Sequence, residues 1–231
     1  VAVFKILNTN TLRSTITMEE IRIYCENTGK YDKVPMGSTL KELSDRICPS
    51  INAKCGSGMP VLAALVDRKL VSLDYKVINP HNVEFIGYDH PDGRRTYIRS
   101  LCFVLQNVVR EMYPEKVLAI DYSLPSGLYC EIREKEELYD GRPKVYFATD
   151  DEIEDIQSRM DEIIAADIPF IKSKKCLNEA VSLFTANGQK EKVNLARSLG
   201  RLTYSVYSLD GQYDTFYGPL VPSTGCLRTF D

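Results

Sequence analysis

Residues 20–47, EIRIYCENTGKYDKVPMGSTLKELSDRI, contain the pattern that decides the fold class. Apolar and polar side chains alternate over residues 20–25, as they do in a β-strand with one buried face. Turn-forming residues follow at 27–30, so residues 31–34 can return as the second strand of a hairpin. The first structural unit of the chain is therefore expected to be an antiparallel hairpin.

A helix is expected directly after this hairpin. Thr39 and Glu42 have the spacing of a capping box, in which each side chain accepts a backbone N–H at the start of a helix. The apolar residues behind them fall on one helical face, and Pro49 is expected to end the helix. Three more apolar segments predict strands, at residues 61–66, 70–73 and 83–88. A hairpin, a helix and further strands within about 65 residues indicate a small α+β sheet crossed by one helix.

The rest of the chain also mixes helices and strands. A linker is expected at residues 90–93, because His-Pro-Asp-Gly is typical of a turn. Apolar residues recur at spacings of three and four over residues 98–112, which predicts a long amphipathic helix. Further helices are expected from residue 150, behind a capping box of Thr149 and Glu152, and over residues 177–185. Strands are expected at residues 117–120, 128–132, 170–172 and 203–209, with a return strand from residue 213.

The composition is that of an ordinary globular chain, with 231 residues, 44% hydrophobic and 26% charged. No apolar run approaches the roughly 18 residues that cross a bilayer, so no membrane segment is expected. The net charge of −3 argues against a dominant nucleic-acid surface, which usually makes a domain basic. The seven cysteines include no C-x-x-C and several lie in apolar runs, so we expect reduced thiols in a cytoplasmic protein.

Common catalytic and metal-binding motifs are absent from the sequence. There is no G-x-x-x-x-G-K-[ST], so no ATP or Mg²⁺ site of the P-loop type is expected within these residues. There is no G-x-S-x-G nucleophile turn either. The histidines are His81 and His90, and a Cys/His zinc site would need ligands grouped at short spacings. We therefore expect no catalytic residue, no metal and no cofactor in this chain.

Two segments carry a first family resemblance. They are residues 34–40, VPMGSTL, before the expected helix, and residues 66–73, VDRKLVSL, around the later hairpin. Both resemble a TGS domain, the β-grasp module of threonyl-tRNA synthetases, some GTPases and stringent-response enzymes. The resemblance covers residues 18–88 and implies a β-grasp fold, with residues 1–17 as an extension. Because the module occurs in unrelated enzymes, it does not by itself indicate a function.

Four segments carry a second resemblance. They are MYP at residues 112–114, LAID at 118–121, SGLY at 126–129 and DTFYGPLVP at 214–222. The third is similar to an N-G-F-Y turn and the last to D-x-C-x-G-P-H-x-P, both found in the editing-type second domain of threonyl- and alanyl-tRNA synthetases. This resemblance covers residues 89–231 and implies an α+β editing-like domain. The two domains then follow each other in the order of the threonyl-tRNA synthetase family.

The sequence departs from the editing family at the residues that carry its chemistry. That family has H-x-x-x-H on the long helix and a cysteine and a histidine in the C-terminal segment, groups that bind zinc or move a proton. The aligned positions hold four other residues here, namely Arg99, Phe103, Phe216 and Leu220. Phenylalanine and leucine can do neither task, and arginine stays protonated near neutral pH. We therefore predict that the chain does not hydrolyse aminoacyl-tRNA.

A remodelled pocket is one interpretation of these replacements. An arginine beside aromatic rings can hold a phosphate or carboxylate and stack a base. The pocket residues would be Arg99, Phe103, Tyr129, Phe216 and Tyr217. The favoured alternative is that the rings fill the vacated site as core, while Arg99 reaches solvent or a carboxylate, because apolar stripes at helical spacing usually belong to a core.

A short basic run lies later in the chain. It consists of Lys172, Lys174 and Lys175, and its ammonium groups can contact phosphates. The alternative, which is the more common meaning of such a run, is a solvated surface. Partners of the region are accordingly a small-molecule ligand or, less favoured, a tRNA.

The same two-domain front end also occurs fused to a uridine-kinase-like P-loop domain in a family of bacterial nucleoside kinases. The loss of the editing residues fits that family better than a working synthetase. We therefore expect the non-catalytic N-terminal region of a nucleoside (uridine) kinase-type protein, with a C-terminal kinase domain that binds ATP and Mg²⁺ as its partner. The alternative is the tRNA-binding region of a threonyl-tRNA synthetase or synthetase-like protein. A third interpretation, an editing deacylase with an unfamiliar site, would require hydrolysis that depends on Arg99.

Overall fold

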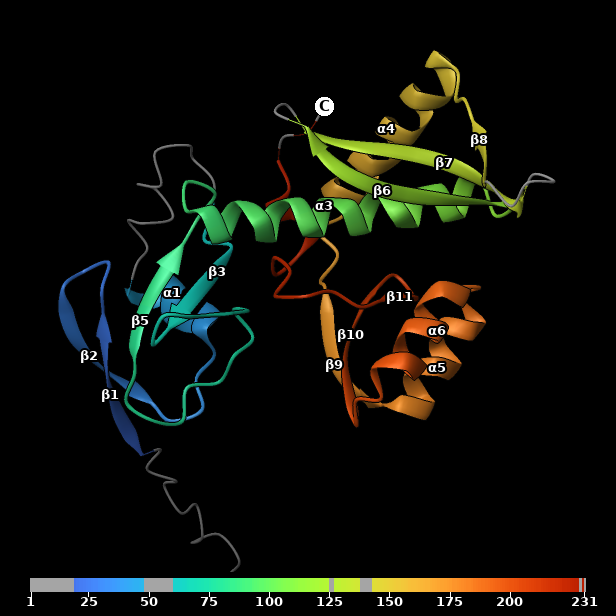
Figure 1. Cartoon of the computed structure of the whole chain (residues 1–231). Helices are drawn as coiled ribbons and strands as arrows, with labels where there is room; N and C mark the ends of the chain where they lie inside the picture. The colour runs from blue at the N-terminus through green and yellow to red at the C-terminus, as the bar shows by residue number, and fades with distance from the viewer. Residues whose placement is uncertain (1–18, 48–59, 125–126, 138–142, 229, 231) are drawn as a thin grey trace, which may run out of the picture.

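Three β-sheets and the helices that pack on them make up this computed structural model (Figure 1). The structure describes residues 19–47, 60–124, 127–137, 143–228 and 230. The predicted α+β class is therefore confirmed, while the expected extension 1–17 and the effect of Pro49 lie outside the described residues. Within the described part, no helix is long and apolar enough to cross a bilayer.

The first sheet has five strands in the order β2–β1–β5–β3–β4. β1 is parallel to β5 and antiparallel to β2, and β3 is antiparallel to both β4 and β5. The predicted hairpin forms the β1–β2 edge of this sheet. The bounds of the strands are Glu20–Cys25 for β1, Lys30–Pro35 for β2, Ala63–Val66 for β3, Lys69–Val71 for β4 and Asn82–Ile86 for β5.

Helix α1 (Leu40–Ile47) packs on this sheet because its apolar face is buried against the strands. The predicted capping box is present at its start. The Thr39 N–H donates to the Glu42 carboxylate at 3.0 Å, and the Glu42 N–H donates to the Thr39 hydroxyl at 3.3 Å. Two otherwise unpaired backbone N–H groups are satisfied in this way, which fixes where the helix begins.

Helix α3 (Pro91–Met112) is the long amphipathic helix expected from the sequence, and it begins earlier than predicted. Residues expected in a linker form its first turn, because His90 is the N-cap and accepts the Asp92 N–H at 3.1 Å. Gly93 in that turn lies against the end of β5, where an added Cβ would be 1.9 Å from the Gly87 carbonyl oxygen. The first turn of helix α3 therefore packs directly against the end of β5 in the first sheet.

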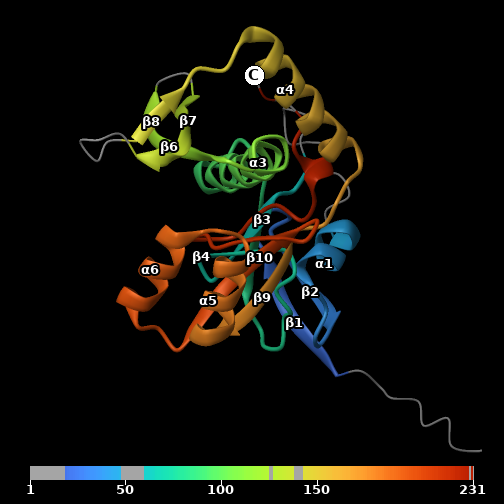
Figure 2. The same ribbon diagram turned by 90° about the vertical axis from the view of Figure 1, so that its right-hand side faces the viewer.

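Helix α3 runs between two groups of elements (Figures 1 and 2). On one side lies an antiparallel sheet in the order β6–β7–β8, together with α4 (Asp150–Ala165), which begins at the predicted Thr149 capping box. The strands of this sheet are β6 (Lys116–Leu124), β7 (Gly127–Glu137) and β8 (Pro143–Tyr146).

On the other side of α3 lies a sheet in the order β11–β10–β9, covered by two helices (Figure 2). The strand predicted at residues 203–209 and the helix predicted at residues 177–185 are both present in this group. Helix α6 of this group and strand β8 of the sheet on the other side of α3 had not been predicted. The bounds are β9 (Ile171–Cys176), α5 (Leu177–Ala186), α6 (Lys190–Leu199), β10 (Thr203–Leu209) and β11 (Gln212–Asp214).

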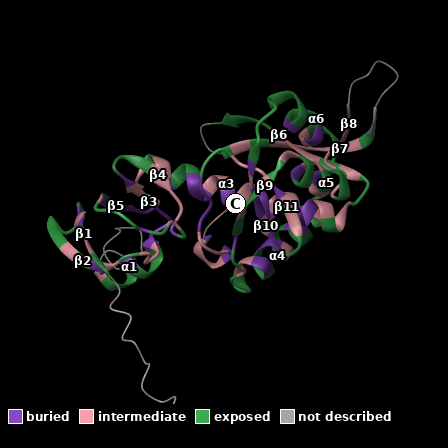
Figure 3. Cartoon of the chain, turned by 90° about the horizontal axis from the view of Figure 1, so that it is seen from below, coloured by how far each residue is buried: buried purple, intermediate pink, exposed green. Residues whose placement is uncertain are grey.

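Buried apolar side chains form separate clusters, and Figure 3 marks the buried residues along the ribbon in purple. One cluster lies between α1 and the first sheet and takes its buried members from residues 23–85. A second surrounds α3 and reaches from Leu62 to Leu227. A third lies between β10 and the helices α5 and α6. Helix α3 therefore organises the larger core of the chain.

Candidate functional site

The positions that align with the synthetase editing residues come together between α3 and the segment that follows β11. Ser100 on α3 joins the two, because its hydroxyl donates to the Thr96 carbonyl at 2.8 Å and accepts the Val221 N–H at 2.9 Å. All of the Ser100 side chain is buried. Because the buried Ser100 hydroxyl has both a donor and an acceptor partner, it fixes the position of the segment that follows β11 along helix α3.

Aromatic and aliphatic side chains fill the interior of this site. Phe103 is fully buried, and its ring centroid lies 5.2 Å from that of Phe216 and 5.9 Å from that of Phe170. Leu220 is also buried and belongs to the same cluster. These distances are those of ordinary aromatic packing. The side chains of Phe103, Phe216 and Leu220 contain no group that can bind a metal or transfer a proton.

Arg99 lies at the edge of the site and is held by the backbone of the segment. Its Nη1 donates to the Pro219 carbonyl at 2.6 Å, so the guanidinium reaches a carbonyl where solvent or a carboxylate had been expected. Gly218 has a φ of +114°, and a Cβ added there would lie 3.0–3.1 Å from the guanidinium atoms. Burial lowers the pKa of Arg99 from its ordinary value, while Tyr207 and Asp92 act in the opposite direction.

A buried carboxylate, Asp214, lies at the start of the segment and is matched by two cations. It accepts hydrogen bonds from Lys192 on α6 and from the Thr215 N–H, and Arg110 on α3 lies 3.5 Å away. Burial lowers the pKa of Lys192, and Asp214 opposes that effect. These partners could not be predicted from the sequence, because Lys192 and Arg110 are far from Asp214 along the chain.

The two remaining residues of the predicted pocket make other contacts. Tyr129 on β7 stacks on Tyr122, with ring centroids 4.7 Å apart, and its hydroxyl donates to Glu131 at 2.9 Å. Tyr217 is 72% exposed, and its ring centroid lies 5.8 Å from Cζ of Arg201. Arg99, Phe103 and Phe216 are thus gathered around one site, whereas Tyr129 lies on another sheet and Tyr217 points outward.

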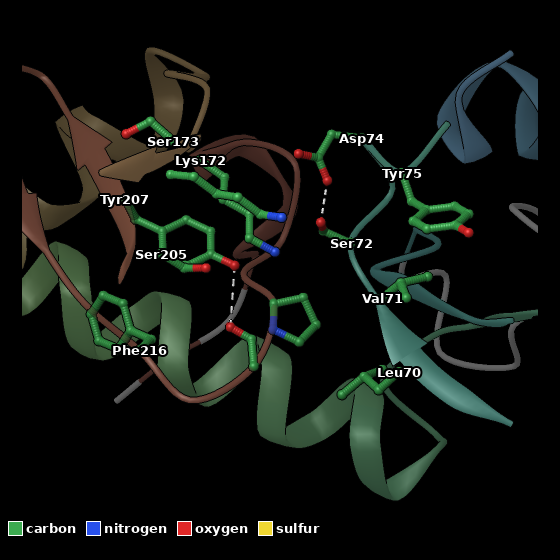
Figure 4. A pocket seen from close by; sticks show the side chains of 13 residues that line it. Leu70, Val71, Ser72, Asp74, Tyr75, Lys172, Ser173, Ser205, Tyr207 and Phe216 are labelled. Atoms are coloured by element: carbon green, nitrogen blue, oxygen red, sulfur yellow. Dashed lines mark hydrogen bonds between the residues drawn. The ribbon is translucent and has the colours of Figure 1, made fainter. Parts of the chain in front are cut away.

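The three lysines of the basic run lie on strand β9, where successive side chains point to opposite faces of the sheet. Lys172 pairs with Tyr207 and Lys174 with Ser205 across β10, while Lys175 pairs with Tyr204. Residues two apart share a face of a strand, so Lys172 and Lys174 lie on one face and Lys175 on the other. The first two line a cleft of about 380 Å³ whose opposite wall is β4 and the loop after it (Figure 4).

Metal-ligating side chains do not cluster among the described residues. Among them, no three histidine, cysteine, aspartate or glutamate side chains lie close enough together to hold an ion. Asp214 is the buried acid of the site, and its neighbours Lys192 and Arg110 are cations, which repel a metal ion. The contacts described in this site are thus packing contacts and ion pairs.

Comparison with known proteins gives the chain its relatives, although no protein-family model matches it. It is 28% identical over 202 residues to the threonine–tRNA ligase of Syntrophotalea carbinolica, covering 86% of this chain and 30% of the relative. It is 29% identical over 204 residues to that of Pelobacter propionicus, covering 87% and 29%. It is 28% identical over 206 residues to that of Clostridium kluyveri, covering 89% and 30%.

The fold and the site define a mixed α+β chain with a packed, non-ligating interior at the candidate site. Over most of its length the chain is similar to threonine–tRNA ligases. The chain spans about 30% of the length of these curated relatives.

Proposed function

We propose that this chain is a non-hydrolytic accessory region of a larger protein, in which synthetase-like domains bind a ligand or partner. The observation that carries the proposal is the interior of the site. Phe103 and Leu220 are buried core residues, and Phe216 packs on Phe103 at 5.2 Å. A water molecule has no activating group on these side chains.

The proposed organisation is a TGS-like β-grasp domain over residues 18–88 and a degenerate editing-like domain over residues 89–231. The strand order β2–β1–β5–β3–β4, with one parallel pair and a helix packed on the sheet, supports the β-grasp assignment. The segment that crosses α3 at Ser100 and retains Gly218 supports the editing-like assignment.

For the parent protein we propose a nucleoside (uridine) kinase-type enzyme, on the resemblance stated above. ATP and Mg²⁺ would then belong to a separate C-terminal kinase domain, and this region would sense a ligand or contact that domain. A P-loop motif encoded downstream of residue 231 would support this assignment. Class II synthetase motifs at that place would overturn it.

The decisive experiment for the non-hydrolytic role is a deacylation assay. Serine-mischarged threonine tRNA is incubated with the purified chain and with its Arg99→Ala variant, and a threonyl-tRNA synthetase that edits serves as the positive control. Both proteins are expected to leave the ester at the uncatalysed rate. Hydrolysis by the parent chain that disappears in Arg99→Ala would refute the proposal and establish an unfamiliar editing site.

A second candidate function is tRNA binding, favoured by the threonine–tRNA ligase relatives that match 86–89% of the chain. A tRNA held through its phosphates would show affinity that falls steeply with salt. Titrations with threonine tRNA, another tRNA and a DNA duplex of similar charge separate the candidates. Preference for the threonine tRNA supports this second function, and equal weak binding of all three supports the first.

A further inference from the structure

The cleft beside Lys172 is built from two parts of the chain that are far apart in sequence. One wall is formed by the β9–β10 face that carries Lys172, Lys174 and Tyr207. The other wall is formed by β4 and the loop after it, including Ser72, Asp74 and Tyr75, as Figure 4 shows. The volume of about 380 Å³ is near the lower end of the range of about 300–1,000 Å³ for ligand pockets.

The two lysines supply positive charge that the described protein does not neutralise. Neither Lys172 nor Lys174 forms an ion pair with any carboxylate in the part of the chain that the structure describes. The ammonium group of Lys172 lies 5.7 Å from the centroid of the Tyr207 ring. Side chains two residues apart on a strand leave its face about 7 Å from each other, a spacing at which both ammonium groups can reach one phosphate.

The opposite wall carries groups of a different kind. The Ser72 hydroxyl donates to the Asp74 carboxylate, so that carboxylate keeps further lone pairs for donors of a ligand. Tyr75 also lines this wall, but its ring points away from the lysines and packs against the core of the first sheet (Figure 4). Burial raises the pKa of Tyr207 to about 12, and the negative charge of Asp74 contributes to that rise.

Charge is thus separated along the cleft, with cations on one wall and a carboxylate acceptor on the other. A free anion such as phosphate would use only the first wall. A planar hydrogen-bond donor without charge would use only the second. A molecule that has a phosphate at one end and hydroxyl or N–H donors at the other end uses both.

We propose that this cleft binds a small phosphorylated ligand of the nucleoside monophosphate class, with its phosphate at Lys172 and Lys174 and its hydroxyl or N–H donors at Asp74. The proposal rests on the proposed non-hydrolytic role, since it names the ligand that such a region would bind. It places the ligand outside the vacated editing site. A ligand that contacts both walls also stabilises their relative position, because binding to the folded state raises its stability.

The chain supplies a matched set of variants for the test. Lys172→Ala and Lys174→Ala each remove one cation from the cleft, and Lys175→Ala removes the same group from the opposite face of the same strand. Isothermal titration calorimetry measures the affinity for the four nucleoside 5′-monophosphates. The four matching nucleosides and inorganic phosphate are titrated in parallel. Circular dichroism melting without ligand verifies that the variants fold.

At least one monophosphate is expected to bind more tightly than its nucleoside and than inorganic phosphate. Lys172→Ala and Lys174→Ala should each weaken that binding by about tenfold, the usual effect of losing one charge-assisted hydrogen bond, and Lys175→Ala should leave it unchanged. Absence of monophosphate binding, equal loss in all three variants, or equal affinity for inorganic phosphate would overturn the proposal. Absence of monophosphate binding without deacylation would leave the non-hydrolytic role intact, whereas deacylation would refute that role.

Discussion

Replacing Gly218 by alanine tests how the segment is held on α3. Gly218 has a φ of +114°, a conformation that costs a residue with a side chain about 1–3 kcal/mol. The added Cβ would also lie 3.0–3.1 Å from the Arg99 guanidinium. The guanidinium is the mobile end of a long side chain and can move away, but it then loses its 2.6 Å hydrogen bond to the Pro219 carbonyl.

The cost of Gly218→Ala can be estimated from these two effects. A hydrogen bond from a charged donor contributes about 1.5–3 kcal/mol, so the total loss of unfolding free energy should be about 3–5 kcal/mol. In a chain of this size each kcal/mol lowers Tm by about 2–4 °C, which predicts a fall of about 10 °C. Gly188→Ala is the matched control, because its φ is +69° and nothing lies within 4 Å of the added Cβ.

A double-mutant cycle separates the two effects. Without the Arg99 side chain, Gly218→Ala should cost only the backbone strain, so the coupling energy between the two changes should be about 1.5–3 kcal/mol. Urea denaturation of the four proteins measures it. The reasoning would be refuted by a coupling energy near zero, or by a loss of unfolding free energy no greater than that of Gly188→Ala. Either result would mean that the hydrogen bond from Arg99 does not stabilise the segment after β11.

Two further predictions concern the surroundings of the site. Gly93→Ala should destabilise the chain by about 2 kcal/mol although alanine is the better helix former by about 1 kcal/mol, because its Cβ would lie 1.9 Å from the Gly87 carbonyl oxygen; a more stable variant in urea denaturation would contradict the packing described here. Burial raises the pKa of Cys102 from 9.0 to about 11, so the unfolded chain ionises first and the free energy of unfolding should fall by about 2 kcal/mol as the pH rises through that range. Urea denaturation at pH 8 to 11 should show a shallower fall for Cys102→Ala, and equal slopes would exclude Cys102 as the cause.

Elements with strong local signals were predictable from the sequence. The β1–β2 hairpin, α1 and α4 follow from alternation and from capping boxes, which are short-range patterns. Helix α6 lacked such a signal, because its first residues are mostly charged and its buried contribution is limited to Val193 and Ala196. Strand β8 has only four residues. Both elements depend on partners that the sequence alone does not identify.

The candidate site was predictable only in part, for a related reason. The residues aligned with the editing positions could be named because a motif in the chain carries them. The partners of Asp214 come from α3 and α6, and the division of Lys172 and Lys174 from Lys175 depends on the register of β9. Contacts of this kind arise from tertiary packing, so a linear pattern does not contain them.

The core around α3 has a consequence for the order in which the chain can fold during synthesis. Hydrogen bonds that join α3 to the C-terminal segment connect residues 120 and 121 positions apart, and the same core includes Leu227. The cluster of the first sheet, in contrast, takes its buried members from residues 23–85. On a ribosome, the first sheet can therefore close early, while the apolar face of α3 stays uncovered until about a hundred further residues have emerged. During that interval the nascent helix exposes its apolar face, which favours aggregation or binding by a chaperone at this stage of synthesis.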